Sequence, residues 1–89
     1  MAWTINYTIS ATKQLRKLDK PAARRIVDYM SERVAPLADP RSTGKALTGK
    51  ALGAFWRYRI GDYRVVCELQ DGALCILVVE LADRKHIYQ

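Results

Sequence analysis

Apolar and polar residues alternate near both ends of the chain and follow a helical period in between. The segment WTINYT, residues 3–8, alternates large apolar with small polar side chains, which predicts a first strand. Three further strands are predicted over residues 54–60, 63–69 and 74–81. The last of these contains LCILVVEL, an almost continuously apolar run that is typical of a central strand covered on both faces.

Two helices are predicted between the first strand and the others. Ser10 is expected to cap the first helix, whereas Asp19 caps the second and Pro21 lies in its first turn. Apolar residues recur at helical spacing: Ala11, Leu15 and Leu18 in the first helix, and Ala22, Ile26, Met30 and Val34 in the second. Because their connection is short, the helices are expected to form an antiparallel αα-hairpin. Residues 35–44 are predicted to be a loop, and residues 45–53 show no clear period.

Two dipeptides set the turns between the C-terminal strands. Gly61-Asp62 has glycine first, as a type II′ turn requires, and Asp71-Gly72 is typical of a type I′ turn. The resulting order is β-α-α-β-β-β, which predicts an α+β fold with the N-terminal αα-hairpin packed on one face of an antiparallel sheet. Because the chain is short, residues 1–89 are expected to form a single domain.

The turns fix which side chains share a face of the sheet, because residues two apart in a strand point the same way. The core face is expected to carry Trp56, Tyr58, Ile60, Val65, Cys67, Leu69, Leu74, Ile76 and Val78. The other face is expected to carry Phe55, Arg57, Arg59, Arg64, Val66, Glu68, Leu77 and Val79. On that second face Arg59 lies directly opposite Arg64, and like charges so placed destabilise a sheet. The arginines therefore predict an exposed binding surface.

The charge balance indicates the kind of partner. Lys and Arg number 15 against 9 Asp and Glu, a net charge of +6 that favours an anionic partner such as nucleic acid or an acidic protein segment. No apolar run reaches the ~20 residues of a spanning helix and no signal peptide is visible, so the expected location is the cytoplasm. The register places Cys75 opposite Glu68 and the thiols of Cys67 and Cys75 on opposite faces, so both are expected to stay reduced.

Three stretches of the chain resemble the RelE/ParE toxin superfamily, and most closely its RelE branch. They are Leu47-Thr48-Gly49, then FWRYRIGDYRVV over residues 55–66, then DRKHIY over residues 83–88. The resemblance implies a RelE-like fold and the toxin of a bacterial type II toxin–antitoxin system. RelE-like toxins are ribosome-dependent endoribonucleases that cut mRNA in the ribosomal A site. The implied partners are therefore the ribosome, mRNA and a RelB-like antitoxin, with no membrane and no small-molecule substrate.

The resemblance also implies which residues form the site. Arg57, Arg59 and Arg64 match the basic sheet positions, Arg84 matches the arginine after the last strand, and Tyr88 matches the C-terminal tyrosine. The sequence departs from the family in two places. Many relatives read Gly-His-Arg where this chain reads Ala82-Asp83-Arg84, so a carboxylate replaces an imidazole. The sequence also ends one residue after Tyr88, which leaves little to hold that side chain in place.

Guanidinium groups dominate the chemistry available at such a site. His86 is the only histidine, which excludes a paired-histidine mechanism, and no cluster has metal-ligand spacing, so neither metal nor cofactor is expected. The hypothesis is that Arg57, Arg59, Arg64 and Arg84 bind the scissile phosphate and stabilise its developing charge, while Tyr88 accepts the proton of the attacking 2′-hydroxyl. Contacts to RNA or the ribosome are expected from Lys45, Lys50, Lys13, Arg16 and Lys17.

Two other functions compete with the nuclease. A ParE-like inhibitor of DNA gyrase shares the fold but is a binding protein, and a basic interaction module would have no catalytic role at all. In either case the sheet arginines could be ordinary solvated strand residues. Arg84 could then pair with Asp83, and the ring of Tyr88 could pack on the sheet. The basic face and the terminal Arg84 and Tyr88 occur together, which favours the nuclease.

Overall fold

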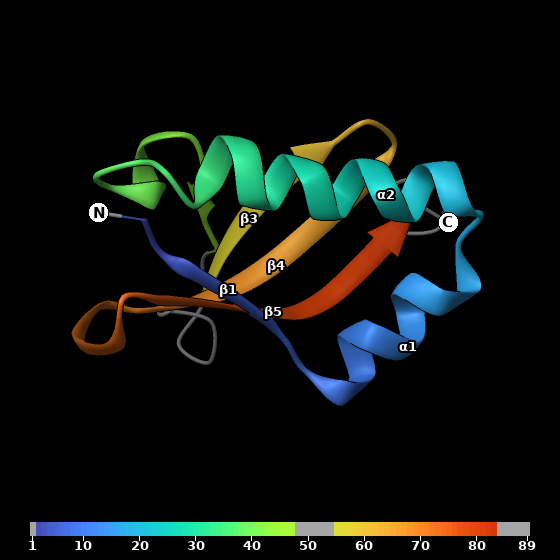
Figure 1. Ribbon diagram of the computed structural model, residues 1–89, viewed down its shortest axis with the longest axis horizontal. Coiled ribbons are helices and arrows are strands. Elements are labelled where there is room, and N and C mark those ends of the chain that lie inside the picture. Colours follow the sequence, from blue (N-terminus) through green and yellow to red (C-terminus); the bar gives the residue numbers. More distant parts are fainter. Residues whose placement is uncertain (1, 48–54, 84–89) are drawn as a thin grey trace.

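A mixed sheet with two helices on one of its faces makes up the computed structural model, which describes residues 2–47 and 55–83 (Figure 1). The strands are β1 (Thr4–Tyr7), β2 (Lys45–Ala46), β3 (Phe55–Ile60), β4 (Tyr63–Gln70) and β5 (Cys75–Asp83). The helices are α1 (Ile9–Lys17) and α2 (Lys20–Tyr29), and α2 continues into one π-helical turn (Met30–Val34). Short 3-10 turns occupy Pro40–Ser42 and Asp71–Ala73.

The strand order is β1-β5-β4-β3-β2. The predicted α+β fold with the helices on one face is confirmed, but the sheet is mixed rather than wholly antiparallel. β1 runs parallel to β5, with Thr4 beside Cys75 and Tyr7 beside Val78. A parallel pair needs a long crossover between its strands, and everything from α1 to β4 serves as that crossover here. The two-residue β2 was not predicted, and it forms the edge of the sheet next to β3.

Capping residues mark where the two helices begin. Thr8 caps α1, because its Oγ1 accepts a hydrogen bond of 3.0 Å from the amide of Ala11. The prediction of Ser10 as the cap was therefore wrong by two residues, and Ser10 lies inside the first turn. Asp19 is the N-cap residue of α2, as predicted, although its side chain makes no capping hydrogen bond.

The core lies between the helices and one face of the sheet. It is formed by buried Trp3, Ala11, Ile26, Met30, Val34, Tyr58, Ile60, Val65, Cys67, Leu69, Ile76, Val78 and Leu81, with Trp56 and Leu74 packed partly buried against it. This agrees with the predicted core face and with the predicted helical stripe. No helix of the described residues is both long and apolar enough to span a membrane.

Of the two turns that join the C-terminal strands, the first agrees with the prediction and the second does not. Gly61 has φ +59°, the left-handed conformation that a type II′ turn requires, and Ile60 lies opposite Tyr63 as predicted. The second turn is a 3-10 turn that ends in left-handed Leu74, so Cys75 lies opposite Gln70 and not opposite Glu68.

That difference moves the register of β5 by two positions. A shift of two keeps each side chain on its face, because the side-chain period of a strand is two. The predicted faces of Ile76 and Val78 therefore hold. Cys67 and Cys75 are buried and free on opposite faces, also as predicted.

Candidate functional site

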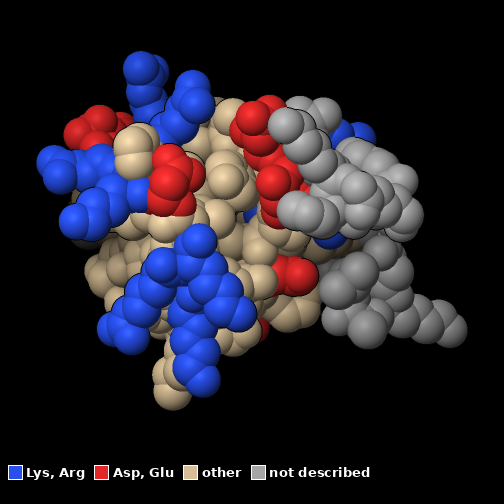
Figure 2. Space-filling model, turned by 90° about the vertical axis from the view of Figure 1, so that its right-hand side faces the viewer, with Lys and Arg blue, Asp and Glu red and all other residues tan. Residues whose placement is uncertain are grey.

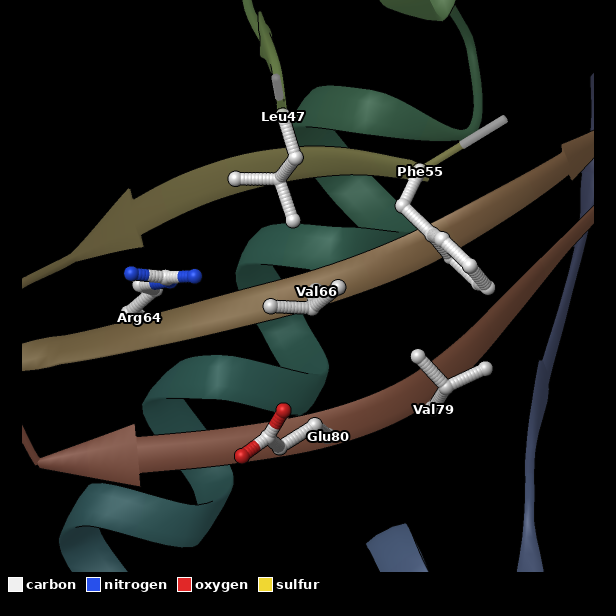
Figure 3. A pocket seen from close by; sticks show the side chains of 6 residues that line it. All are labelled: Leu47, Phe55, Arg64, Val66, Val79 and Glu80. Atoms are coloured by element: carbon white, nitrogen blue, oxygen red, sulfur yellow. The ribbon is translucent and has the colours of Figure 1, made fainter. Parts of the chain in front are cut away.

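The face of the sheet opposite the helices carries a pocket. Figure 3 looks onto this helix-free face, with α2 behind the strands. The pocket has a volume of about 350 Å³ and is lined by Leu47, Phe55, Arg64, Val66, Val79 and Glu80. Phe55 and Val79 lie at one end of it, whereas Arg64 and Glu80 lie at the other (Figure 3). The pocket therefore has an apolar floor and a charged end.

Four cationic residues share the helix-free face by register. Arg59 lies directly opposite Arg64, as the sequence predicted, and Lys45 of β2 lies directly opposite Arg57. The sheet thus contains two adjacent pairs of like charges. Such pairs destabilise a sheet, so their presence on three neighbouring strands favours a binding role for this face.

None of these four cations is neutralised within the described residues. The ion pairs found there are Arg24–Asp28, Arg41–Asp39 and Arg41–Asp71. The Nε atom of Arg57 is buried and donates no hydrogen bond. A buried donor without an acceptor is costly, and an anionic ligand on this face would supply one.

The four cations do not line one common hollow. Arg64 lines the pocket of Figure 3. Lys45, Arg57 and Arg59 line a second hollow of about 280 Å³, together with Gly44 and Tyr29. This hollow lies at the edge of the sheet, where the short β2 leaves part of β3 uncovered. The cations are therefore neighbours on one face but do not all converge on one point.

Side-chain contacts hold the segment before β2 in place and so position Lys45. The hydroxyl of Tyr58 donates a hydrogen bond of 2.8 Å to the carbonyl of Pro40. Gly44 lies against the ring of Tyr58, where an added Cβ would come within 3.0 Å of the ring carbons. Arg41 also binds both carboxylate oxygens of Asp71, at 3.0 and 2.6 Å.

The cations of α1 lie in the other layer. Lys13, Arg16 and Lys17 are exposed on a helix whose buried Ala11 contacts the core. Figure 2 shows lysine and arginine side chains gathered over this end of the molecule, with acidic groups among them. The α1 cations were predicted to contact RNA or the ribosome, and the sheet arginines to bind the scissile phosphate. The structure does not bring the two groups together.

Of the predicted site residues, Lys50, Arg84 and Tyr88 lie outside the described residues, as does His86. Asp83 is the last residue of β5 and lies opposite Tyr63. No group of three or more His, Cys, Asp or Glu side chains in the described part of the chain could hold a metal ion.

Glu80 is a pocket residue that the sequence reasoning missed. Val66 lies opposite Glu80 but the next residue, Cys67, lies opposite Val78, so Val79 is the extra residue of a β-bulge. Without the bulge, Glu80 would lie opposite Val65 and point toward the core. The bulge instead places Glu80 on the helix-free face. A lone glutamate within an apolar strand was the available signal.

Comparison with protein families identifies the chain. A family model described as the ParE toxin of the type II toxin–antitoxin system parDE matches residues 5–88. The chain belongs to the ParE toxin family. As a ParE-family protein it is the toxin of a type II toxin–antitoxin pair within the RelE/ParE superfamily, which confirms the superfamily predicted from the sequence. A comparison with curated proteins gives no match.

Several solved structures similar to this ParE-family toxin are described as RelE toxins or RelE–RelB complexes. The toxin–antitoxin complex RelBE2 of Mycobacterium tuberculosis has a TM-score of 0.84 at 21% identity, over 94% of this chain and 93% of that one. The isolated RelE toxin of E. coli has a TM-score of 0.73 at 19% identity, over 98% and 92%. The archaeal RelE–RelB complex of Pyrococcus horikoshii OT3 has a TM-score of 0.67 at 25% identity, over 94% and 97%. The RelE-like fold is thereby confirmed.

Proposed function

We propose that this toxin is a ribosome-dependent, metal-independent endoribonuclease that cleaves mRNA and so inhibits translation. The proposal rests on two pairs of like charges that lie opposite each other in the sheet, Lys45 with Arg57 and Arg59 with Arg64. None of these four side chains forms an ion pair with another described residue. A polyanion bound there would remove a repulsion that the sheet otherwise retains. The ribosome as target places this activity in the cytoplasm.

In the proposed reaction the cations hold the scissile phosphate. Arg57, Arg59 and Arg64 bind its oxygens and stabilise the charge that develops as the 2′-oxygen attacks phosphorus. Arg84 and Tyr88 keep their predicted roles as a further phosphate ligand and as an acceptor of the 2′-hydroxyl proton. Lys45 and Lys50 contact the RNA backbone, and Lys13, Arg16 and Lys17 of α1 offer a second basic surface for ribosomal RNA.

Gyrase inhibition is the second candidate function, and the ParE description of the matching family model favours it. Such a toxin would act by binding and would not need a phosphate site on the sheet. The third candidate, a basic interaction module, would need neither gyrase nor an intact phosphate site.

Mapping transcript ends in cells that express the toxin separates the three. The nuclease predicts codon-phased cuts within translated messages, and these cuts should be absent with the Arg59→Ala variant. That variant should retain or raise its thermal stability, because Arg59 is exposed and lies opposite Arg64. Intact messages with accumulating cleaved gyrase–DNA complexes would instead establish the ParE-like function. Intact messages and unaffected gyrase would leave the interaction module.

The same face is the proposed docking surface for a RelB-like antitoxin. Several similar structures are complexes of a RelE toxin with a RelB antitoxin. Here the apolar floor of Phe55, Val66 and Val79 lies beside unpaired cations, which suits a segment that alternates acidic and apolar residues. Protection of Arg64 from a guanidine-modifying reagent by the cognate antitoxin would support this, and unaltered modification would contradict it.

A further inference from the structure

Glu80 has no role in the arginine-based reaction, yet it lies in the same pocket as Arg64 (Figure 3). Its side chain is exposed and forms no ion pair with any described residue. The β-bulge at Val79 is what keeps it on this face. Bulges are over-represented beside active sites, where they redirect a side chain. The carboxylate of Glu80 therefore shares the pocket with Arg64 but forms no ion pair with it.

The register sets the spacing between the two charged groups. Arg64 lies opposite Ala82, so Glu80 is its diagonal neighbour on the adjacent strand. Diagonal neighbours are roughly 7–8 Å apart at the backbone, within reach of long side chains. A phosphodiester between them could contact the guanidinium of Arg64 through its oxygens and present the adjoining ribose to the carboxylate of Glu80.

We infer that Glu80, in place of Tyr88, accepts the proton of the 2′-hydroxyl in mRNA cleavage, an inference that rests on the proposed function and changes only this one role. The 2′-oxygen gives its proton to the carboxylate as the bond between that oxygen and phosphorus forms. The bond between phosphorus and the 5′-oxygen breaks, and the 5′-oxygen takes a proton from solvent. The products are a 2′,3′-cyclic phosphate and a 5′-hydroxyl, and the carboxylic acid of Glu80 returns its proton to solvent.

This assignment makes a different prediction from Tyr88 as the acceptor. A free carboxylic acid is ionised well below neutral pH, whereas a free phenol ionises near pH 10. With a carboxylate as acceptor, the cleavage rate should be flat between pH 6.5 and 8.5. With a phenolate as acceptor, the rate should rise by up to about tenfold per pH unit over that range.

The test is single-turnover cleavage of a defined mRNA in the A site of purified ribosomes, with the intact toxin. Glu80→Gln should lose about 100-fold or more in rate, the usual contribution of a general base, while ribosome binding is unchanged or tighter because a negative charge is gone. Glu68→Gln is the matched control, since Glu68 is on the same face at the far end of β4 and bonds to Gln70. It should cleave at the wild-type rate.

The outcomes separate the inference from the proposed function. If the wild type cleaves and Glu80→Gln cleaves equally fast, the inference is overturned and the nuclease proposal stands. If the wild type does not cleave, the nuclease proposal fails and the inference fails with it. Glu80→Asp keeps a carboxylate and should retain part of the rate with the same flat pH profile. Loss of ribosome binding in both Glu80 variants would show a structural role instead and would also overturn the inference.

Discussion

Replacement of Arg64 by glutamine should make the toxin more stable and inactive at once. Glutamine keeps part of the aliphatic stem over the pocket floor and removes only the charge. Arg59 lies directly opposite and is exposed, so the repulsion between the two acts mostly through water. For unit charges about 6 Å apart in water, Coulomb's law gives about 0.7 kcal/mol, within the range for cross-strand like-charge pairs.

This free energy corresponds to a measurable shift in melting temperature. For a domain of this size, 1 kcal/mol moves the melting temperature by about 4–8 °C, so Arg64→Gln should melt about 3–6 °C higher at low salt. The gain should shrink in 1 M NaCl, where the screening length falls to about 3 Å. Arg24→Gln is the control for net charge, because Arg24 is exposed on α2 and paired with Asp28. It should melt at or slightly below the wild-type temperature.

A double-mutant cycle with Arg59→Gln isolates the pair itself. The double variant should gain less than the sum of the two single variants, because either change alone removes the repulsion. Transcript cleavage should be lost in both single variants. A lower melting temperature for Arg64→Gln, or a gain that is the same at high salt, would refute the reasoning that these guanidinium groups repel each other across the sheet.

Two predictions concern the scaffold. Gly44→Ala should lower the free energy of unfolding by about 1–3 kcal/mol, because its Cβ would press on the fully buried ring of Tyr58, and an unchanged urea midpoint would contradict this close packing. Burial raises the pKa of the Cys67 thiol to about 12, so the folded state keeps that proton. The thiol therefore contributes stability that is complete below about pH 9 and is lost progressively from there to pH 12. Urea unfolding between pH 8 and 10.5 should show a steeper decline for the wild type than for Cys67→Ala, and parallel declines would count against it.

Much of the fold followed from short-range patterns in the sequence. Period-two alternation and the Gly61 turn gave the correct partner for each residue of β3, including Arg59 opposite Arg64. The predicted faces of β5 were also correct, although the 3-10 turn before Cys75 was not predicted. That turn shifts the pairing of β5 with β4 by two residues, and a shift of two leaves each side chain on the same face.

What the sequence did not reveal depended on contacts between distant segments. An odd displacement, such as the bulge at Val79, changes which residue faces the core, and within LCILVVEL the lone polar residue Glu80 is the only sign of its position. Glu80 was missed for that reason. The pairings of β1 with β5 and of Lys45 with Arg57 likewise join segments that are not adjacent in the sequence, and alternation carries no information about such partners.

The parallel pairing of β1 with β5 has a consequence for the order of events during synthesis. β1 leaves the ribosome first, but the strand it joins is among the last to be made. Because β1 and β5 are far apart in the sequence, their pairing forms late, after the chain between them has lost much of its conformational freedom. In a nascent chain that stops short of β5, β1 has no neighbouring strand to pair with. The core residue Trp3, just before β1, then has no completed sheet to pack against. The fold would thus be completed only once translation of the chain had passed β5.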